Sequence, residues 1–365
     1  MTSTRKALLL SGSLGMGHDV AAEACAVSLR AHGWSTETLD SMRMLGRRGA
    51  SMGKAAFRGL LATPGLFDAI HFSALRTGNQ PAGFMDWMAR RKIVPHLRAY
   101  LDENPADLVI SVFATGASAI SNLANRYPRM NHAVICTDAT PHRLWVHPHV
   151  DLYLVTSAPA EAAVRRFQPE ARIQVIPGPV RPAFYQPPTQ EAARERHGVP
   201  LEERCVLLMT GGWGLGPVAS VAEALAVAGV HVLAVAGRNR KLEQRFSAVA
   251  RRQQRVRPFG FTDTIPELMA AADLVVTSSG SDTCIEARTV GRPLLLLDIV
   301  QGHGRDNLQH ELELGDAAVT SARTADVVRN TLAALDRVKP PQPGPVRSLA
   351  EWEAAFLSAL ATIGA

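Results

Sequence analysis

Short apolar runs alternate with stretches of helical periodicity along the whole chain. The runs that predict buried strands are 6–10, 36–39, 108–113, 133–136, 152–156, 173–176, 205–209, 231–235, 274–277 and 293–297. Helical patterns cover 19–31, 87–101, 118–126 and 218–228, and an amphipathic pattern covers 348–363. Strands alternating with helices are typical of a parallel sheet covered by helices on both faces. The sequence therefore predicts an α/β fold.

The same unit starts twice in the chain. An apolar strand, a Gly-rich turn and a helix begin at residue 6 and again at residue 205, and five prolines lie within 177–188 between them. Such a density of prolines predicts a linker. We therefore expect an N-terminal Rossmann-like domain over 1–180 and a C-terminal Rossmann-like domain over 181–345. A final helix in 346–365 is expected to pack back toward the N-terminal domain. Two such domains would face each other across a cleft, because ligands of open parallel sheets bind beyond the carboxyl ends of the strands.

Composition places the chain among globular proteins, with 47% hydrophobic and 20% charged residues. No apolar run is long enough for a signal peptide or a membrane span, so we expect a cytoplasmic protein. The four cysteines, Cys25, Cys136, Cys205 and Cys284, lie in apolar stretches and form no CxxC pair. They are expected to be buried free thiols rather than zinc ligands or a disulfide framework.

The net charge of +6 arises entirely in residues 1–180, which hold 19 basic and 13 acidic residues. Within them, 42–98 holds ten basic and two acidic residues interleaved with aromatic and leucine side chains. A basic face attracts phospholipid headgroups, nucleic acid or phosphorylated substrates, and a plain solvated surface is the alternative. The segment suits a peripheral contact with an anionic membrane at the inner face, but its apolar residues could instead cover a core or line a pocket.

Three polar loops of the second half could bind a nucleotide sugar. The turn Thr210–Gly216 and the segment 278–286 both follow a strand and open a helix. Glycines and helix N-termini suit a diphosphate, although a tight structural turn has the same composition. Glu286 could accept hydrogen bonds from a ribose diol, or it could be a helix-surface charge. The loop 301–307 could bind sugar hydroxyls, or it could be an ordinary surface loop.

The first half offers a candidate base. His18 follows the first Gly-rich turn and begins a helix, where the helix N-terminus disfavours an imidazolium. A neutral imidazole suits a general base, although a single histidine is more often a packing residue. Asp138 follows a strand and could orient the base. His142, His147 and His149 lie nearby, but no carboxylate or thiol set completes a site, so we expect no metal.

With these residues the chain resembles the GT-B glycosyltransferases of the monogalactosyldiacylglycerol synthase and processive diacylglycerol glucosyltransferase type. The similar motifs are Gly15–His18, Thr137-Asp138 with His142 and Trp145, Asp151-Leu-Tyr153, Thr210–Pro217, Ala236–Leu242 and Gly260–Thr262. Several weak motifs in the same order make a specific signal, which extends from residue 8 to about residue 317.

The resemblance implies a metal-independent, inverting hexosyltransferase without a cofactor. A UDP-sugar would be the donor and a lipid or small natural product the acceptor. His18 would be the catalytic base, assisted by Asp138, and Gly17, His142 and Trp145 would bind the acceptor. The expected donor-binding residues are Gly211, Gly212, Gly214, Gly216, Gly237, Arg238, Phe261, Ser279, Gly280, Ser281, Asp282, Thr283, Glu286, Gly302, His303, Arg305, Asp306 and Asn307.

The sequence also departs from the family pattern. A Gln-Glu pair expected to meet sugar hydroxyls is His303-Gly304 here, and Trp213 replaces a glutamate. The donor sugar therefore need not be galactose or glucose. Two other functions stay open: a nucleotide-sugar epimerase of the same fold, such as a UDP-N-acetylglucosamine 2-epimerase, and a non-catalytic nucleotide-sugar binder. A nucleic-acid partner is not expected, because the chain lacks RNA-binding aromatic motifs.

Overall fold

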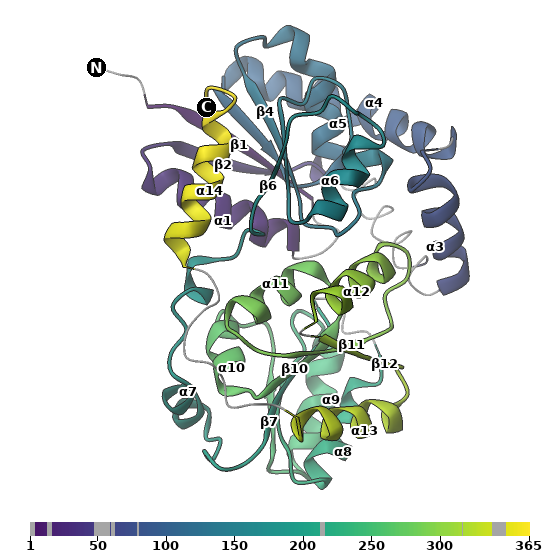
Figure 1. The fold of residues 1–365 in the computed structure, drawn as a ribbon, viewed down its shortest axis with the longest axis vertical. Coiled ribbons are helices and arrows are strands. Elements are labelled where there is room, and N and C mark those ends of the chain that lie inside the picture. The colour runs from purple at the N-terminus through teal and green to yellow at the C-terminus, as the bar shows by residue number, and fades with distance from the viewer. Residues whose placement is uncertain are drawn as a thin grey trace. The chain divides into compact units, whose positions relative to one another are not determined.

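The computed structural model describes residues 4–12, 17–46, 59, 63–78, 80–211, 216–315, 317–337 and 348–365. The chain forms two compact units (Figure 1). The first comprises Met1–Arg181, Gln301–His303 and Leu349–Ala365, and the second comprises Pro182–Val300 and Gly304–Ser348. The chain therefore passes from one unit to the other within the proline-rich stretch.

A six-stranded parallel sheet forms the first unit, in the order β2-β1-β3-β4-β5-β6. Its strands are β1 (Lys6–Ser11), β2 (Ser35–Asp40), β3 (Leu108–Ser111), β4 (Asn131–Cys136), β5 (Leu152–Val155) and β6 (Ile173–Val175). Its helices are α1 (Gly17–Ala31), α3 (Pro64–Ile70), α4 (Gln80–Glu103), α5 (Ala114–Leu123), α6 (Ala158–Arg165) and α14 (Leu349–Ala361). Short helical turns are η1 (Arg43–Leu45), η2 (His71–Leu75), η3 (Ala124–Arg126) and η4 (Arg143–Trp145).

Apolar side chains of alternate strand positions hold the helices on this sheet. Ile93 and Leu97 of α4 join Leu8, Leu10 and Val109 in one buried cluster. Such alternation follows from the two-residue period of a strand, which sends successive side chains to opposite faces. The helix α14 also belongs to this unit, where Trp352 and Phe356 are buried and stacked with ring centroids 5.1 Å apart.

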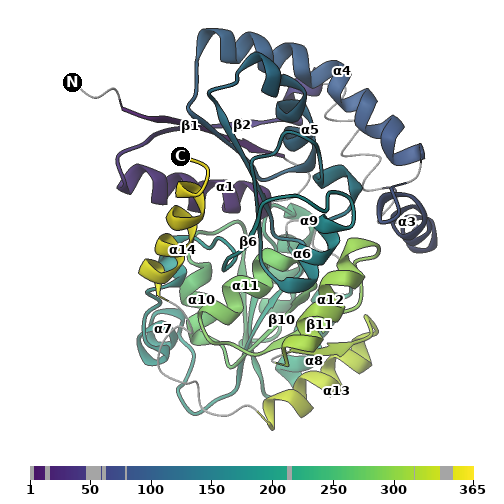
Figure 2. The same cartoon turned by 45° about the horizontal axis from the view of Figure 1, so that its top comes forward.

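The second unit repeats this architecture with the order β12-β11-β10-β7-β8-β9, again parallel throughout. Its strands are β7 (Cys205–Met209), β8 (His231–Val235), β9 (Val256–Phe259), β10 (Leu274–Ser278), β11 (Leu294–Leu297) and β12 (Ala317–Thr320). Its helices are α7 (Gln190–His197), α8 (Val218–Val227), α9 (Arg240–Ala250), α10 (Ile265–Ala271), α11 (Ser281–Thr289), α12 (His303–Leu314) and α13 (Thr324–Leu335), with η5 (Pro182–Phe184) before α7. In the views of Figures 1 and 2, helices cover both faces of this sheet.

The predicted α/β fold with two parallel sheets is confirmed, and each of the ten predicted strands is present. The edge strands β9 and β12 were not predicted. Each is only partly buried, so neither carries a continuous apolar run, and β9 contains Arg257 and Pro258. Proline and charged residues are typical of edge strands because they discourage further strand pairing.

A buried arginine ties the helix α7 to the second sheet. Arg194 is 3% exposed and donates to Asp273 Oδ1 at 2.7 Å and to the carbonyl oxygen of Ala271 at 3.0 Å. The same guanidinium donates to three carbonyl oxygens of the loop before β7, at Pro200, Leu201 and Glu203. The second carboxylate oxygen of Asp273 accepts from the Cys205 amide at 2.8 Å. The pair therefore joins α7, β7 and the start of β10.

We expect Arg194→Met to lower the free energy of unfolding by about 3–5 kcal/mol, because it leaves the carboxylate and several carbonyl groups without their donor. Urea unfolding followed by circular dichroism measures this change. The matched control is Arg196→Met, since Arg196 is an exposed residue paired with Glu267 at 3.2 Å and its loss should cost about 1 kcal/mol or less. Equal effects of the two substitutions would contradict the assigned role of Arg194.

Candidate functional site

In each sheet the order of the strands reverses at the first strand of the unit. In the first unit β2 lies on one side of β1 and β3 on the other, and in the second unit β8 and β10 flank β7 in the same way. Loops that leave such a pair of strands diverge at the carboxyl ends, where open α/β sheets bind their ligands. One loop cluster therefore follows β1 and β3, and a second follows β7 and β10.

His18 lies in the first cluster, in the opening turn of α1. Its imidazole meets the ring of Phe113 with centroids 4.7 Å apart and planes at 61°, and the ring of Trp145 with centroids 6.1 Å apart. Phe113 and Trp145 contact each other at 6.4 Å. They are only 9% and 3% exposed, so two apolar rings cover one side of the half-buried imidazole. The structure thus brings together two predicted residues, His18 and Trp145, and adds Phe113, which was not predicted.

Gly12 makes room for the Phe113 ring. A Cβ atom at Gly12 would lie 2.1 Å from Phe113 Cδ1, far closer than atoms can approach. Phe113 in turn is the residue that precedes α5, directly after β3. Because β1 and β3 are neighbours, the glycine after one strand and the ring after the other meet at the same edge. This adjacency is the signal that could have identified Phe113 from the sequence.

A chain of hydroxyl groups fixes the beginning of α1. Ser11 Oγ donates to Asp19 Oδ1 at 2.5 Å, one residue after His18. Ser41 Oγ donates to the Ser11 carbonyl oxygen at 2.8 Å and lies 2.8 Å from Thr115 Oγ1 in the first turn of α5. Side chains from β1, the end of β2 and α5 are therefore connected around the turn that carries the histidine.

The predicted residues of the β4–β5 connection follow the end of β4. Asp138 is half-buried two residues beyond that strand, and His142 directly precedes η4, which contains Trp145. The buried Tyr153 holds this connection: its hydroxyl donates to the His147 carbonyl oxygen at 3.0 Å and accepts from the His147 amide at 2.8 Å. The tyrosine of the Asp-x-Tyr motif therefore holds the connection that contains Trp145 through two hydrogen bonds to the backbone of His147.

In the second cluster, Ser279 joins the turns after β10 and β11. Ser279 Oγ is buried and donates to the carbonyl oxygen of Gly304 at 2.7 Å. A Cβ atom at Gly304 would lie 2.4 Å from Val300 Cγ1, so this close approach requires glycine. The hydroxyl of Ser279, predicted to bind donor, thus also holds the first turn of α12 in place.

The remaining predicted donor residues of this cluster lie along the same sheet edge. Gly280 precedes α11, and Ser281, Asp282 and Thr283 form its half-buried first turn, with Glu286 at 7% exposure one turn further. Gly302 adopts a left-handed φ of 62° directly before α12, which begins at His303 and contains exposed Arg305, half-buried Asp306 and buried Asn307. After β7, Gly211 and Gly216 have φ values of 66° and 85°, whereas Gly212 and Gly214 lie outside the described residues.

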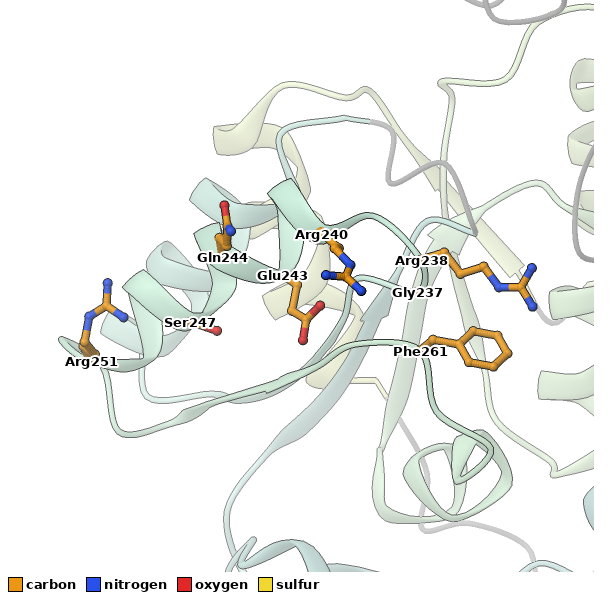
Figure 3. A pocket seen from close by; sticks show the side chains of 8 residues that line it. All are labelled: Gly237, Arg238, Arg240, Glu243, Gln244, Ser247, Arg251 and Phe261. Carbon is orange, nitrogen blue, oxygen red and sulfur yellow. The ribbon is translucent and has the colours of Figure 1, made fainter. Parts of the chain in front are cut away.

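Arg238 and Phe261 extend from the turns after β8 and β9 (Figure 3). The guanidinium carbon of Arg238 lies 4.6 Å from the centroid of the Phe261 ring, which is 54% exposed. Both residues border a cavity of ≈ 690 Å³ whose lining is Gly237, Arg238, Arg240, Glu243, Gln244, Ser247, Arg251 and Phe261. An exposed ring backed by a guanidinium offers a flat surface on which a planar group can stack. The structure therefore brings the predicted residues Gly237, Arg238 and Phe261 together.

The described residues provide neither a reactive thiol nor a cluster of metal ligands. All four cysteines are buried and free, as predicted, and burial raises the pKa of Cys25, Cys205 and Cys284, that of Cys205 to about 12. Thiols of that kind are poor nucleophiles. Within the described ranges, no three His, Cys, Asp or Glu side chains are arranged to hold a metal ion.

Comparison with known families adds to this geometry. Residues 18–175 match the model of monogalactosyldiacylglycerol (MGDG) synthase, and residues 217–326 match the model of the glycosyltransferase family 28 C-terminal domain. Over these segments the chain is similar to the MGDG synthases and to the family 28 glycosyltransferases. The probable chloroplastic MGDG synthase of Glycine max is 33% identical over 195 residues, which is 50% of this chain and 36% of that protein. A processive diacylglycerol beta-glucosyltransferase of Bacillus pumilus is 28% identical over 54% of this chain and 52% of its own length.

The alignments therefore span between about a third and half of these MGDG-synthase-type relatives. Solved structures with low identity share the fold. MurG of Acinetobacter baumannii has a TM-score of 0.56 at 13% identity and covers 98% of this chain and 94% of its own. A UDP-glucosyltransferase from Polygonum tinctorium has a TM-score of 0.61 at 13% identity, covering 100% and 96%. The predicted GT-B fold is confirmed. Among the described residues, no helix has the length and hydrophobicity needed to cross a bilayer.

We expect Gly12→Ala to lower the free energy of unfolding by about 1–3 kcal/mol, because the new methyl group must displace the Phe113 ring. Urea unfolding of Gly12→Ala, of Phe113→Leu and of the double variant measures the effect, and the loss in the double variant should be smaller than the sum of the two single losses. Gly83→Ala in α4 is the control, because a Cβ atom at Gly83 meets nothing within 4 Å and should be neutral or stabilising. Additive effects at positions 12 and 113 would contradict the contact.

Acid should destabilise the first unit through a buried histidine. Burial, with the charge of His147 adding to it, lowers the pKa of His132 from 6.5 to about 3, and His132 Nε2 lies 3.1 Å from Ser111 Oγ. Since the unfolded chain binds this proton and the folded chain does not, the contribution is complete above pH 6.5 and is lost as the pH falls toward 3.

For His132 alone, the free energy of unfolding should fall by at most about 1.4 kcal/mol per pH unit in that window. Urea midpoints between pH 7 and pH 4.5 should therefore fall less steeply in His132→Asn than in the parent. His149→Asn is the control, since His149 is exposed and asparagine tolerates its left-handed φ of 60°. Parallel pH profiles for the parent and His132→Asn would exclude His132 as the source.

Proposed function

We propose that the chain is an inverting glycosyltransferase that moves a hexose from a UDP-sugar to the hydroxyl of a diacylglycerol-type lipid. One observation carries the proposal: two family models match successive segments, and each segment contains predicted site residues of one loop cluster. The first begins at His18, and the second contains the predicted donor residues from Ser279 to Asn307. The lipid acceptor is proposed from the names of the relatives, an MGDG synthase and a diacylglycerol glucosyltransferase.

In this proposal His18 is the general base. It takes the proton of the acceptor hydroxyl as the acceptor oxygen bonds to C1 of the sugar, while the bond from C1 to the diphosphate breaks and UDP leaves. A single displacement of this kind inverts the anomeric carbon. Phe113 and Trp145 hold the imidazole on one side and leave its other side for the acceptor, with Asp138 proposed as the group that orients the base. Gly17, His142 and Trp145 are the proposed acceptor contacts.

The second cluster is proposed to bind the donor. Amide groups of the turn 211–216 and of the first turn of α11 stabilise the leaving diphosphate, which is the role that preorganised donors perform at developing charge. Glu286 is proposed to accept from the ribose diol, and Phe261 with Arg238 to stack on the uracil. The loop 302–307 is proposed to meet the sugar.

The sugar itself is proposed to differ from those of the family pattern. At position 304 the pattern has a glutamate, and here the carbonyl of Gly304 accepts from Ser279 while Val300 fills the space of a side chain. The contact of a glutamate at position 304 with the sugar is therefore proposed to be replaced by backbone groups and by the side chains of His303 and Arg305, with Asp306 nearby in the sequence. Assay of several UDP-hexoses decides which donor is used.

We expect His18→Gln to lower kcat by about 10²–10⁴-fold, because the base is removed from the transition state. Product formation from UDP-glucose, UDP-galactose and UDP-N-acetylglucosamine with dioctanoylglycerol measures turnover, and NMR of the product reports the anomeric configuration. Thermal stabilisation by UDP should be unchanged in His18→Gln and reduced in Glu286→Gln, since only the second residue is proposed to contact the nucleotide.

Two outcomes would contradict this assignment. Retained turnover in His18→Gln would remove the histidine from the role of base, and retention of the donor configuration would exclude a single displacement. Isomerised sugar released from UDP-N-acetylglucosamine without any acceptor would instead identify an epimerase.

A further inference from the structure

The buried face of α12 in the second unit is polar. Its buried residues are Gly304, Asn307 and Glu311, which recur at the three- and four-residue spacing of one helix face. The leucines of α12, at positions 308, 312 and 314, are half-buried or exposed. Hydrogen bonds and charge therefore carry much of the attachment of α12 to the rest of its unit.

An ion pair connects this face of α12 with α11. Arg288 Nη1 donates to Glu311 Oε2, and the side chain of Glu311 is 4% exposed whereas that of Arg288 is 25% exposed. A carboxylate so deeply buried depends on a cation beside it, because removal from water disfavours its charged form. Figures 1 and 2 show the two helices side by side. The buried charge therefore limits how far α11 and α12 can move apart.

A second connection lies seven residues earlier on the same face of α12. There the carbonyl oxygen of Gly304 accepts from Ser279 Oγ at 2.7 Å. With a rise of about 1.5 Å per residue, positions 304 and 311 are about 10 Å apart along the helix. Two attachments at this separation determine both the position and the direction of α12. Their partners, Ser279 and Arg288, flank the part of the chain that is proposed to bind the diphosphate and the ribose.

The ion pair also lies close to Glu286, the proposed ribose ligand. Burial raises the pKa of the Cys284 thiol, and Glu311 raises it further whereas Arg288 lowers it. Asp282 and Glu286 also raise this pKa. Since Coulomb interactions weaken with distance, all four charged groups lie around one buried thiol. The pair can therefore affect donor binding in two ways, through the position of α12 and through its charge.

We propose that Arg288 is a positioning residue for the donor sugar. By holding Glu311, it sets α12 against α11, and so sets the distance between Arg305 and the first turn of α11. The inference rests on the proposed function, which assigns Arg305 to the sugar and that turn to the diphosphate. It adds a pair of residues that touch neither donor nor acceptor and lie outside the family motifs.

Three variants of the full chain break the pair: Arg288→Gln, Glu311→Gln and the double variant. Isothermal titration gives their dissociation constants for UDP and for whichever of UDP-glucose, UDP-galactose and UDP-N-acetylglucosamine binds the parent most tightly. Each variant should bind this UDP-sugar about 10–100-fold more weakly, since a displacement of about 1 Å can cost about 10²-fold. Binding of UDP should change much less, because UDP lacks the sugar that α12 is proposed to meet.

The two single variants separate position from charge. Arg288→Gln makes the surroundings of the site more negative and Glu311→Gln makes them more positive, yet both break the same contact. The proposal requires both to weaken UDP-sugar binding, and the loss in the double variant to stay well below the sum of the single losses. Opposite effects of the two single variants would identify charge as the cause and overturn the proposal.

Two further variants are the controls. Arg288→Lys keeps a cation beside Glu311 and should retain most of the UDP-sugar affinity. Arg252→Gln is the matched control, because Arg252 follows α9 and pairs with Glu223 of α8 at 2.8 Å in the same unit, and it should bind UDP-sugar as the parent does. Circular dichroism and thermal unfolding report whether each variant is folded. If Arg288→Gln does not fold, Glu311→Gln decides, since it leaves no buried carboxylate behind at position 311.

The outcomes distinguish this inference from the proposed function. In folded Glu311→Gln, equal losses for UDP and the UDP-sugar, or no loss for either, would overturn the positioning role and leave the transfer reaction standing. A parent that binds UDP-sugars but transfers no sugar to dioctanoylglycerol would contradict the proposed function and leave the role of Arg288 in donor binding intact. A parent that binds none of the three UDP-sugars would overturn both.

Discussion

Parallel hydrogen bonding between β1 and β3, and again between β7 and β10, is the constraint on which both loop clusters depend. In a parallel pair, the carboxyl ends of both strands lie at one edge, so whatever follows each strand is brought to the same place. Gly12 and Phe113 meet for this reason, although about a hundred residues separate them in the chain. The turns after β7 and β10 are neighbours through the same geometry.

Apolar rings surround the proposed base His18. Phe113 and Trp145 place their rings beside the imidazole, and the hydroxyl chain from Ser11 to Thr115 fixes the helix that carries it. Packing against these two rings therefore helps to set the position of the imidazole. Tyr153 extends the arrangement, because its hydroxyl holds the connection that contains Trp145.

The repeated α/β architecture could be predicted from the sequence because buried strands of a parallel sheet are continuous apolar runs, as in 205–209 and 294–297. The strands β9 and β12 could not, since an edge strand is half exposed and resembles a loop. Similarly, the glycines and the histidine of the turns were evident from composition. Phe113 was not, because its role depends on strand order, and strand order is a long-range property.

The role of Ser279 was only partly evident from the sequence. Its hydroxyl is predicted to bind the donor, and the structure adds a partner within the fold, the carbonyl oxygen of Gly304, which follows a different strand.

The contact between Gly304 and Val300 restricts the order in which substitutions at these two positions can be accepted. A side chain at 304 would overlap Val300 Cγ1 and crowd Ser279 Oγ, so a glutamate cannot be introduced there in one step without moving the first turn of α12. Replacement of Val300 by a smaller residue must come first. Two related sequences that differ at 304 are thus separated by a mutational path with a required first step, and directed evolution toward a different sugar would have to diversify both positions at once.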